Sequence, residues 1–341
     1  MVGGVVLSMA LASPAVGAAQ QQEPAAASAS GATTTATDDD EARRGPAAAP
    51  IAAPADMKLR VEGASRHTVN VGKRVKAIAR MKPFVPGQEI VFMVTHHGKT
   101  LKKRKLAVRQ IGSRDVGKAS MPSPHFIKPG RYKVRAFHEA TPEQEAADKE
   151  YRFHITYPDL HPGSHGDAVQ IFNRLLRRQG YYVTVGKGYG PATERAVMAF
   201  RKTNRMRRSW DANPDIFRTL ADGKGTFHLK YPGRGRHVEV DISRQVMVLA
   251  DHGKAQHIFH VSTGAPSTPT IRGHFHFYRK DPGFNSIGMY YSVYFIRGYA
   301  THGYHSVPAY NASHGCVRNP IPNSRFIYNW INLGMSIWTY S

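Results

Sequence analysis

The chain contains 341 residues and carries a formal net charge of +23 at pH 7. Its length exceeds that of one small domain and leaves room for two or three. Its single cysteine, Cys316, excludes an intramolecular disulfide and any metal site built from two or four cysteines. The positive charge indicates anionic surroundings, such as nucleic acid, acidic lipid or an anionic cell-wall polymer. We expect no nucleic-acid partner, because the basic residues follow no helix-turn-helix, zinc-finger or aromatic-platform pattern.

The N-terminal part of the chain predicts export. Within residues 1–19 an apolar run is followed by Val16-Gly17-Ala18, and small residues of this kind precede signal-peptidase cleavage sites, which predicts a signal peptide or its remnant. The alternative is a low-complexity tail. Residues 20–55 are rich in Ala, Thr, Pro, Ser, Gln and acidic residues, which predicts a disordered linker. No later apolar run is long enough to span a bilayer. From the N-terminal segment we expect an exported protein of the cell wall or extracellular space.

Residues 56–158 are predicted to form an immunoglobulin-like (Ig-like) β-sandwich of about seven short strands. Gly and Pro breakers separate runs of β-branched and apolar residues. The clearest runs are Val75–Ala79, Ile90–Thr95, Leu101–Val108, Tyr132–Phe137 and Tyr151–Ile155. Between positions 58 and 135 there are 20 Lys and Arg against 3 Asp and Glu. The domain is therefore either an anchor for an anionic cell-wall polymer or a merely soluble basic face.

Residues 159–225 are predicted to form a small helical module. Apolar residues recur at helical spacing between Val169 and Leu176 and again between Ala196 and Phe200. The order of glycines and apolar residues resembles the peptidoglycan-binding-domain-1 family, a three-helix module. The resemblance is carried by Gly163, Gly166, Val169, Phe172, Leu175, Gly180-Tyr181, Gly188-Tyr189-Gly190, Thr193, Ala196-Val197, Phe200-Arg201 and Thr219-Leu220. It implies binding to the cell wall, and the alternative is a spacer of the same fold. The family usually has Gln where this chain has Arg201.

Residues 226–341 return to strand-like patterns. Polar and apolar side chains alternate over residues 237–242, and an apolar run follows at 246–249. Helical spacing appears once, in Phe326, Trp330 and Leu333. The fold class predicted for the whole chain is therefore multidomain and mainly β.

The residues that point to chemistry lie in the segment 313–318, Ser-His-Gly-Cys-Val-Arg. A thiol with a pKa of ~8.5 is mostly protonated at neutral pH, so a nucleophilic cysteine needs a base or a cation nearby. His302 and His314 are the candidates for Cys316. His314 would share a face with Cys316 if the segment were extended. His302 would have to arrive on a neighbouring strand across the loop 304–312.

This segment is similar to the signature of the L,D-transpeptidase catalytic domain family, in which a His-Gly pair is followed by Ser/Thr-His-Gly-Cys. The resemblance covers residues 236–341 and includes two upstream elements. They are Ser262-Thr263-Gly264 and Thr268-Pro269-Thr270, the second followed by Gly273. It implies a mainly β, sandwich-like catalytic domain.

The resemblance also implies residue roles. Cys316 would be the nucleophile and His302 the general base, while the Gly303 carbonyl orients the imidazole and His314 shapes the nucleophile loop. The expected substrate-binding residues are Arg318, Ser313 and Gly315. A guanidinium at position 318 could hold a substrate carboxylate through two parallel hydrogen bonds, or it could form a structural ion pair. For the oxyanion, the candidate donors are the backbone N–H groups of Cys316 and Gly315, or the hydroxyl of Tyr290 or Tyr291.

The implied reaction is acyl transfer on peptidoglycan stem peptides. Cys316 would attack the carbonyl between the third residue and D-alanine and release D-alanine, and an amine of a second stem would then give a 3→3 cross-link. Transfer to water would make an L,D-carboxypeptidase, and transfer to a protein amine would attach that protein to the wall. An alternative from another class is a non-catalytic wall-binding protein. No metal or organic cofactor is implied, and the alternating pair His274 and His276 is interpreted as surface histidines because no third ligand stands nearby.

Overall fold

The structure, a computed structural model, describes residues 52–341, which form 18 strands and four helices. This part of the chain is mainly β, as the sequence predicts. The predicted export signal at 1–19 lies outside the described residues, as does most of the predicted linker at 20–55. The linker prediction extends too far, because Ala53 pairs with Gln144 and its N–H donates to the Glu143 carbonyl at 3.0 Å. The last residues of that segment therefore belong to the first folded part.

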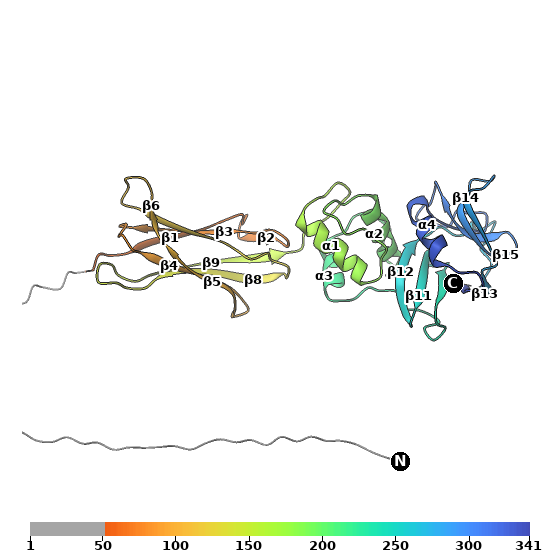
Figure 1. Ribbon diagram of the computed structural model, residues 1–341, viewed down its shortest axis with the longest axis horizontal. Helices are drawn as coiled ribbons and strands as arrows, with labels where there is room; N and C mark the ends of the chain where they lie inside the picture. The colour runs from red at the N-terminus through yellow and green to blue at the C-terminus, as the bar shows by residue number, and fades with distance from the viewer. Residues whose placement is uncertain (1–51) are drawn as a thin grey trace, which may run out of the picture. The chain divides into compact units, whose positions relative to one another are not determined.

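Residues 56–156 form two sheets. The first consists, in spatial order, of β1 (Asp56–Glu62), β3 (Lys76–Lys82), β7 (Gly117–Pro122) and β6 (Arg109–Gln110). The second consists of β2 (Thr68–Asn70), β9 (Ala147–Thr156), β8 (Gly130–His138), β4 (Glu89–His96) and β5 (Lys99–Ala107). Figure 1 shows β1 and β3 in one layer and β4, β5 and β8 in the other. We call this pair of sheets the sandwich.

Strand alternation produces the core of the sandwich. Met57 and Ala79 of one sheet and Phe92 and Val134 of the other are buried between the layers. The sequence neighbours of Met57 are exposed and those of Val134 are half-buried, whereas Ile78 and Val91, next to Ala79 and Phe92, are buried as well. Nine strands are present rather than about seven. The additional ones include β2 and β6, which are three and two residues long and too short to show a period of two.

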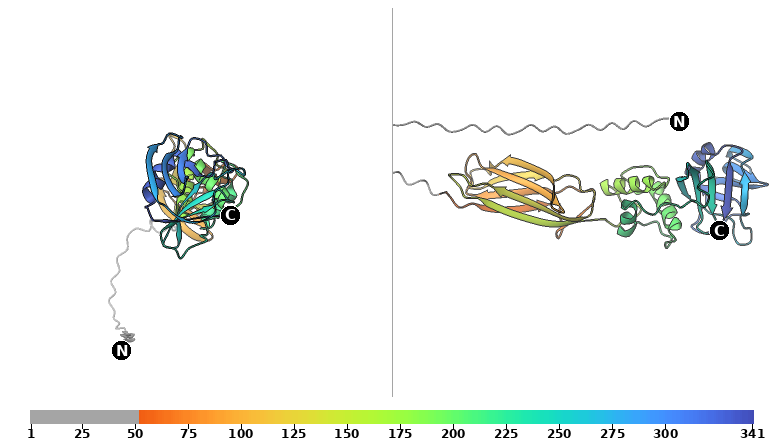
Figure 2. Two further views of the ribbon diagram at one scale, coloured as in Figure 1. Left: turned by 90° about the vertical axis from the view of Figure 1, so that its right-hand side faces the viewer. Right: turned by 90° about the horizontal axis from the view of Figure 1, so that it is seen from below.

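Three helices follow the sandwich: α1 (Asp167–Arg178), α2 (Pro191–Thr203) and α3 (Pro214–Ala221). They form a separate group in the right-hand view of Figure 2. Pro191 and Pro214 occupy first-turn positions, where the missing N–H costs no hydrogen bond. The Asn213 side chain accepts from Ile216 N and caps α3. We call residues 159–225 the helical module.

The C-terminal residues form two further sheets and one helix. The first sheet has the order β12 (Lys254–His260), β11 (Val246–Asp251), β10 (His237–Asp241), β18 (Ser336–Tyr340) and β13 (Gly273–His276). The second has the order β14 (Arg279–Phe284), β15 (Tyr290–Ile296), β16 (Tyr299–Tyr304) and β17 (Val317–Pro320). Helix α4 (Ile321–Trp330) ends before Leu333, which is exposed rather than on the predicted helical face.

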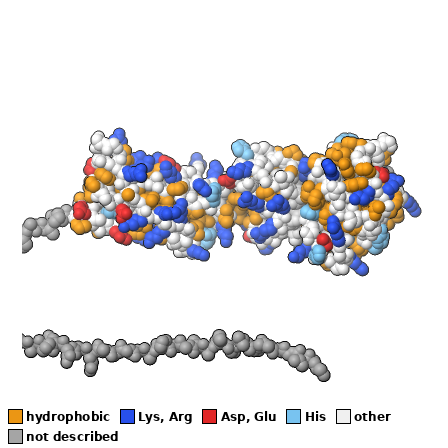
Figure 3. All heavy atoms as spheres, in the orientation of Figure 1, with side chains coloured by type: hydrophobic (Ala, Val, Ile, Leu, Met, Phe, Trp, Pro, Cys, Tyr) orange, Lys and Arg blue, Asp and Glu red, His pale blue; other side chains and the backbone are white. Residues whose placement is uncertain are grey.

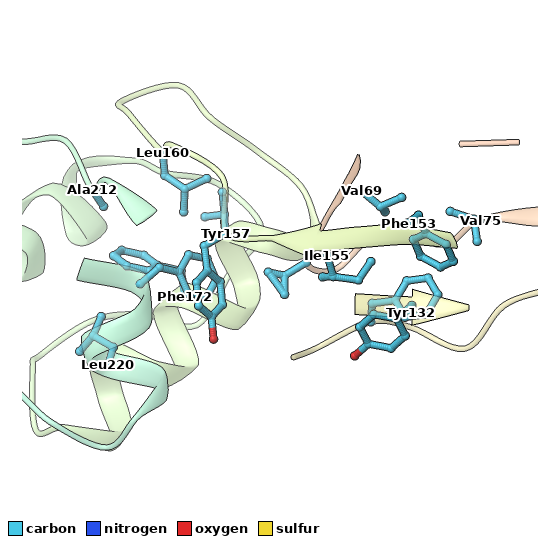
Figure 4. Packing of buried hydrophobic residues seen from close by; sticks show 14 of the residues in the cluster. Val69, Val75, Tyr132, Phe153, Ile155, Tyr157, Leu160, Phe172, Ala212 and Leu220 are labelled. Atoms are coloured by element: carbon cyan, nitrogen blue, oxygen red, sulfur yellow. The ribbon is translucent and has the colours of Figure 1, made fainter. Parts of the chain in front are cut away.

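Two large apolar cores hold these parts together. One runs from the sandwich into the helical module, where the rings of Tyr157 and Phe217 stack at 4.4 Å between centroids. Figure 4 shows Tyr157 and Leu160 lying between Ile155 on the sandwich side and Phe172 on the helical side. The other core fills the C-terminal sheets and includes Val240. Among the described residues, no helix is long and apolar enough to cross a membrane.

Candidate active site

The parallel strands β16 and β17 position the predicted nucleophile and base. In their register Thr301 lies opposite Val317 and His302 opposite Arg318. Cys316 directly precedes β17 and packs against a small buried cluster of Met289, Tyr294 and Ala300, the last of which lies two positions before His302. Because strand side chains two positions apart share a face, Cys316 and His302 lie on the same face of neighbouring strands. This is the arrangement that the loop length between them predicts.

The imidazole of His302 is buried and held in one orientation. Its exposed fraction is 3%, and Nδ1 lies 2.9 Å from the Gly303 carbonyl oxygen. A carbonyl only accepts, so Nδ1 carries the proton and Nε2 keeps a lone pair. Burial lowers the pKa of His302 to about 4, and the positive Arg318 acts in the same direction. The ring is therefore a neutral base at physiological pH.

The thiol of Cys316 is partly buried and lies 3.6 Å from the carbonyl oxygen of Gly298. Burial raises the pKa of this thiol, although Arg318 opposes the shift. Within the described part of the chain no hydrogen bond joins its sulfur to His302. Hydrogen bonds between catalytic groups are commonly loose before substrate binds. Rotation about the Cα–Cβ bond of Cys316 would change the partner of the sulfur without moving the backbone.

Hydrogen bonds from the upstream motifs fix the loop before Cys316. The Thr270 hydroxyl donates to the Gly315 carbonyl at 2.7 Å and accepts from Gly264 N at 2.8 Å. The Thr268 hydroxyl donates to the Ser313 carbonyl at 2.9 Å. These residues belong to the two elements that carry the sequence resemblance, and the structure gives them a supporting position behind the nucleophile loop.

Two expectations for the nucleophile loop need correction. Gly315 has φ 117°, so the segment bends there and does not continue as a strand. His314 therefore does not share a face with Cys316, as an extended segment would require. His314 is exposed. The Gly315 N–H is donated to Ser313 Oγ at 3.1 Å, and that hydroxyl also donates to the Cys316 carbonyl. Gly315 N–H is therefore engaged within the loop and is not available to an oxyanion in this conformation.

Arg318 faces the same side of the sheet as His302. Its guanidinium carbon lies 4.1 Å from the ring centroid of Tyr304, which is cation–π geometry. It forms no ion pair with any carboxylate of residues 52–341, so the structural ion pair that the sequence left open does not occur there. A partly exposed, unpaired guanidinium beside the thiol can bind an anionic group of a ligand.

The site also contains residues that sequence reasoning missed. Tyr299 covers the nucleophile loop so closely that a Cβ on Gly315 would lie 2.6 Å from its Cε1. Gly298 supplies the carbonyl next to the thiol. A Cβ on Gly303 would lie 3.0 Å from the Cβ of Ser324 on α4 and 3.2 Å from that of Tyr290. The turn signal Arg297-Gly298 indicates a hairpin, but it does not reveal that this hairpin folds over Cys316.

No metal site emerges from the described residues, which contain no cluster of three or more His, Cys, Asp or Glu side chains able to hold an ion. His274 and His276 are exposed, with 4.8 Å between ring centroids. His274 stacks on Trp338 at 4.2 Å.

Comparison with known proteins assigns this region to a family. Residues 235–338 match the YkuD family, described as the L,D-transpeptidase catalytic domain. An L,D-transpeptidase structure from Xylanimonas cellulosilytica is 30% identical, with a TM-score of 0.51, and the match covers 54% of this chain and 98% of that one. Among curated proteins there is no match.

Two further solved structures are more distant. An L,D-transpeptidase from Stackebrandtia nassauensis is 19% identical, with a TM-score of 0.33, covering 53% of this chain and 94% of that one. The catalytic domain of an Enterococcus faecium L,D-transpeptidase is 21% identical, with a TM-score of 0.28, covering 31% of this chain and 98% of that one.

Proposed function

Because the chain belongs to the L,D-transpeptidase family, we propose that it is a peptidoglycan L,D-transpeptidase that forms 3→3 cross-links through a thioester on Cys316. The observation that carries the proposal is the placement of Cys316 and His302 on one face of neighbouring strands. The 2.9 Å contact between His302 Nδ1 and the Gly303 carbonyl leaves Nε2 as the basic atom of the ring.

The acylation step follows from the protonation states of the two groups. Both the thiol and the imidazole are neutral at rest, since burial raises the pKa of Cys316 and lowers that of His302. His302 Nε2 takes the thiol proton as sulfur attacks the carbonyl carbon between the third stem residue and D-alanine. The imidazolium then returns this proton to the leaving amine. D-alanine departs, and the acyl group remains on sulfur as a thioester.

The second step restores the enzyme. An amine from a neighbouring stem attacks the thioester carbonyl and loses a proton to His302 Nε2. The C–S bond breaks, the Cys316 sulfur recovers a proton, and the new amide is the 3→3 cross-link. If water replaces the amine, the product is a free carboxylate and the enzyme acts as an L,D-carboxypeptidase. If the amine belongs to a protein, that protein becomes attached to the wall.

We assign substrate recognition to Arg318, whose unpaired guanidinium shares the face of the sheet with His302. A planar guanidinium binds a carboxylate through two parallel hydrogen bonds. The D-alanine carboxylate lies next to the bond that is broken. Ser313 contributes indirectly, because its hydroxyl ties Gly315 N to the Cys316 carbonyl. The Cys316 backbone N–H remains our proposed oxyanion donor.

The substrate would be presented outside the cell membrane, so the proposal includes export, with the helical module binding the wall beside the catalytic domain. We test the reaction by intact-protein mass spectrometry with muropeptide tetrapeptides. The expected result is a thioester adduct, loss of D-alanine and new 3→3 dimers. Cys316→Ala abolishes the adduct, and His302→Ala slows its formation by at least ~10²-fold.

Other outcomes of this experiment have defined meanings. D-alanine release without dimers would replace transpeptidation by carboxypeptidase activity. Adduct formation with a protein amine as the best acceptor would favour attachment of proteins to the wall. A chain that forms no adduct, yet still sediments with purified cell walls, would overturn the catalytic proposal in favour of wall binding alone.

We also propose that the outer face of the first sheet of the sandwich binds an anionic cell-wall polymer. Lys58 lies directly opposite Arg80, Arg80 opposite Lys118, and Lys118 opposite Arg109. This basic row crosses four strands, and none of its members forms an ion pair with a residue of 52–341. Like charges directly opposite each other destabilise a sheet, and a polyanion lying along the row would remove that repulsion.

The surroundings of the basic row agree with an anionic ligand. A surface pocket of about 510 Å³ lies at its end and is lined by Arg109 and Lys118, among others. Figure 3 shows Lys and Arg side chains spread over the visible surface of the sandwich. Neighbouring strands are about 4.8 Å apart, so the row presents regularly spaced cations to a repeating anion.

Long-chain inorganic polyphosphate is a suitable probe for this surface. The variant Lys58→Gln/Arg80→Gln/Lys118→Gln should weaken binding and reduce the slope of log K against log salt by roughly one per lost contact, as for nucleic acids. The control Lys99→Gln/Lys103→Gln/Arg131→Gln changes net charge equally, away from the row. Equal losses in the two variants would contradict a defined site and leave only the net charge of the domain.

A further inference from the structure

The helical module makes direct contact with the loop that joins the proposed base to the proposed nucleophile. We call residues 305–312 the connecting loop. We propose that Lys202 and Arg208 of the helical module are positioning residues, which set the place of Cys316 relative to His302. Lys202 acts through His260 on the carbonyl of Val307, and Arg208 acts directly on the carbonyl of Ala309. This inference rests on the proposed function for its catalytic consequence, but not for its structural one.

Lys202 is a buried lysine whose ammonium contacts three acceptors. It lies near the C-terminal end of α2, and only 2% of its surface is exposed. Its ammonium lies 2.7 Å from His260 Nδ1, 2.7 Å from the Val261 carbonyl and 3.2 Å from the Gln245 carbonyl. An ammonium has three N–H donors, and all three have acceptors here. Burial also lowers the pKa of Lys202 well below its usual range.

His260 transmits the contact to the connecting loop. Its ring is buried, with Nδ1 facing Lys202 and Nε2 lying 3.0 Å from the carbonyl oxygen of Val307. Because the Val307 carbonyl only accepts, the ring proton is on Nε2, and Nδ1 accepts from Lys202. Burial, together with the charge of Lys202, lowers the pKa of His260 well below its usual range. Lys202, His260 and Val307 therefore form one continuous hydrogen-bonded line.

Arg208 makes a second, independent contact. Its guanidinium donates to the carbonyl of Ala309, two residues beyond Val307. The segment that carries Arg208 is shaped by Arg201, which donates to the carbonyls of Arg207 and Asp211. Two neighbouring residues of α2 are thus connected to the connecting loop: Arg201 through the segment that carries Arg208, and Lys202 through His260.

A second path leads from Lys202 toward the nucleophile. Lys202 holds the backbone carbonyl of Gln245, and the Gln245 side chain accepts from Thr263 N at 2.7 Å. The Thr263 carbonyl then accepts from Ala312 N at 2.9 Å and from Ser313 N at 3.0 Å. The end of the connecting loop at Ala312, four residues before Cys316, is therefore linked to Lys202, as Val307 is.

The helical module is fixed closely enough to act as a support. Ile258 N donates to the Gly180 carbonyl at 2.8 Å, and Tyr182 N donates to Ile258 O at 3.3 Å. The segment therefore pairs with β12, which ends at His260. A Cβ on Gly180 (φ 89°) would lie 2.7 Å from the Ala255 carbonyl oxygen, so only glycine permits this approach. Figure 1 shows α2 beside β12.

A matched pair of substitutions at His260 tests the line. Glutamine can accept from Lys202 through Oε1 and donate to Val307 through Nε2, whereas leucine can do neither. We expect His260→Leu to lower kcat on muropeptides at least about tenfold with little change in KM, since misplaced reacting groups reduce kcat. His260→Gln should recover most of the activity. Lys202→Met should resemble His260→Leu.

A loss of activity caused by lower stability has to be distinguished from one caused by displacement of the connecting loop. Leu220→Ala removes a buried side chain from the same helical module without touching the connecting loop, and it should lower the unfolding temperature by several degrees. It is expected to retain wild-type kcat below its unfolding temperature. If Leu220→Ala lowers kcat as much as His260→Leu does, the contact is merely structural and the proposal is overturned.

A readout that needs no turnover separates this proposal from the proposed function. Hydrogen exchange of the amides of residues 305–316, followed by mass spectrometry, should be faster in His260→Leu than in His260→Gln, Leu220→Ala or wild type. Faster exchange in a chain with no transpeptidase activity would leave the positioning role standing and remove the proposed function. Unchanged exchange in His260→Leu and Lys202→Met would overturn the positioning role whatever the chain catalyses.

Discussion

Burial shifts the pKa values of both Cys316 and His302, and each shift favours the neutral form. It disfavours the thiolate of Cys316 and the imidazolium of His302 alike. A resting ion pair between them is therefore unfavourable, and the proton has to move while the substrate carbonyl is attacked. The orientation of His302 by Gly303 matters more in such a mechanism, because the base must accept the proton within the transition state.

The low pKa of His302 determines how catalysis depends on pH. His302 has a pKa of about 4, and the base works in its neutral form, which is present above that value. We expect kcat/KM to remain high down to about pH 5 and to fall only near pH 4. The measurement is kcat/KM against pH, with circular dichroism at each pH as the control for folding. An acid limb near pH 6.5 in folded protein would contradict this prediction.

Gly303→Ala is the second prediction. The added Cβ would meet Ser324 and Tyr290, so β16 would have to shift away from α4 and take His302 with it. We expect the free energy of unfolding to fall by about 1–3 kcal/mol, as for overpacked cores, and kcat/KM to fall as well. Chemical denaturation and steady-state kinetics measure the two effects. Adding Ser324→Ala removes the closest contacting atom and should restore part of both losses.

At the residue scale, sequence reasoning reached the groups that carry reactivity but not those that surround them. A lone Cys in a Ser-His-Gly-Cys segment and a His fourteen residues earlier could be named from chemistry and loop length. Tyr299, Gly298 and Ser324 could not, because their roles arise from side chains that approach across strands and helices. The exposure of His314 depends on the φ angle of Gly315, which cannot be predicted from the sequence.

At the scale of elements, the loops behind the nucleophile act as one hydrogen-bonded support. Thr270 joins Gly264 to Gly315 through one hydroxyl, which accepts from the N–H of Gly264 and donates to the carbonyl of Gly315. We expect Thr270→Val, a change of similar shape, to leave two buried backbone groups unpaired and to destabilise by about 2 kcal/mol. Thermal unfolding and the rate of adduct formation measure this. Thr270→Ser keeps the hydroxyl, and a loss as large as that of valine would contradict the account.

The alternation of apolar residues in the sequence predicted where strands lie better than it predicted which strands pair. The apolar runs of the first domain correspond to β3, β4, β5, β8 and β9. The parallel pairing of β16 with β17 and of β10 with β18 could not be derived, because periodicity shows which side chains face inward and not which strand lies alongside. The short strands β2 and β6 and helix α3 were likewise below the length at which a period is visible.

At the scale of the whole molecule, buried histidines make stability depend on pH. Burial lowers the pKa of both His260 and His302 in the folded chain, while the unfolded chain titrates near ~6.5. Below that pH the unfolded state binds more protons, so stability falls as pH falls. Each group contributes up to about 1.4 kcal/mol per pH unit. Urea unfolding between pH 7 and 5 measures the slope, and His302→Asn should reduce it by about one proton.

The pairing of Gly180 and Tyr182 with Ile258 also determines which fragments of the chain remain monomeric. Strand β12 is the end of its sheet, and this segment of the helical module covers its hydrogen-bonding edge. An uncovered edge is a template for another chain. A fragment beginning at residue 226 would expose that edge together with the cavity left by Lys202, and we expect it to self-associate in sedimentation experiments. A fragment beginning at residue 159 would keep its edge closed, and we expect it to remain monodisperse.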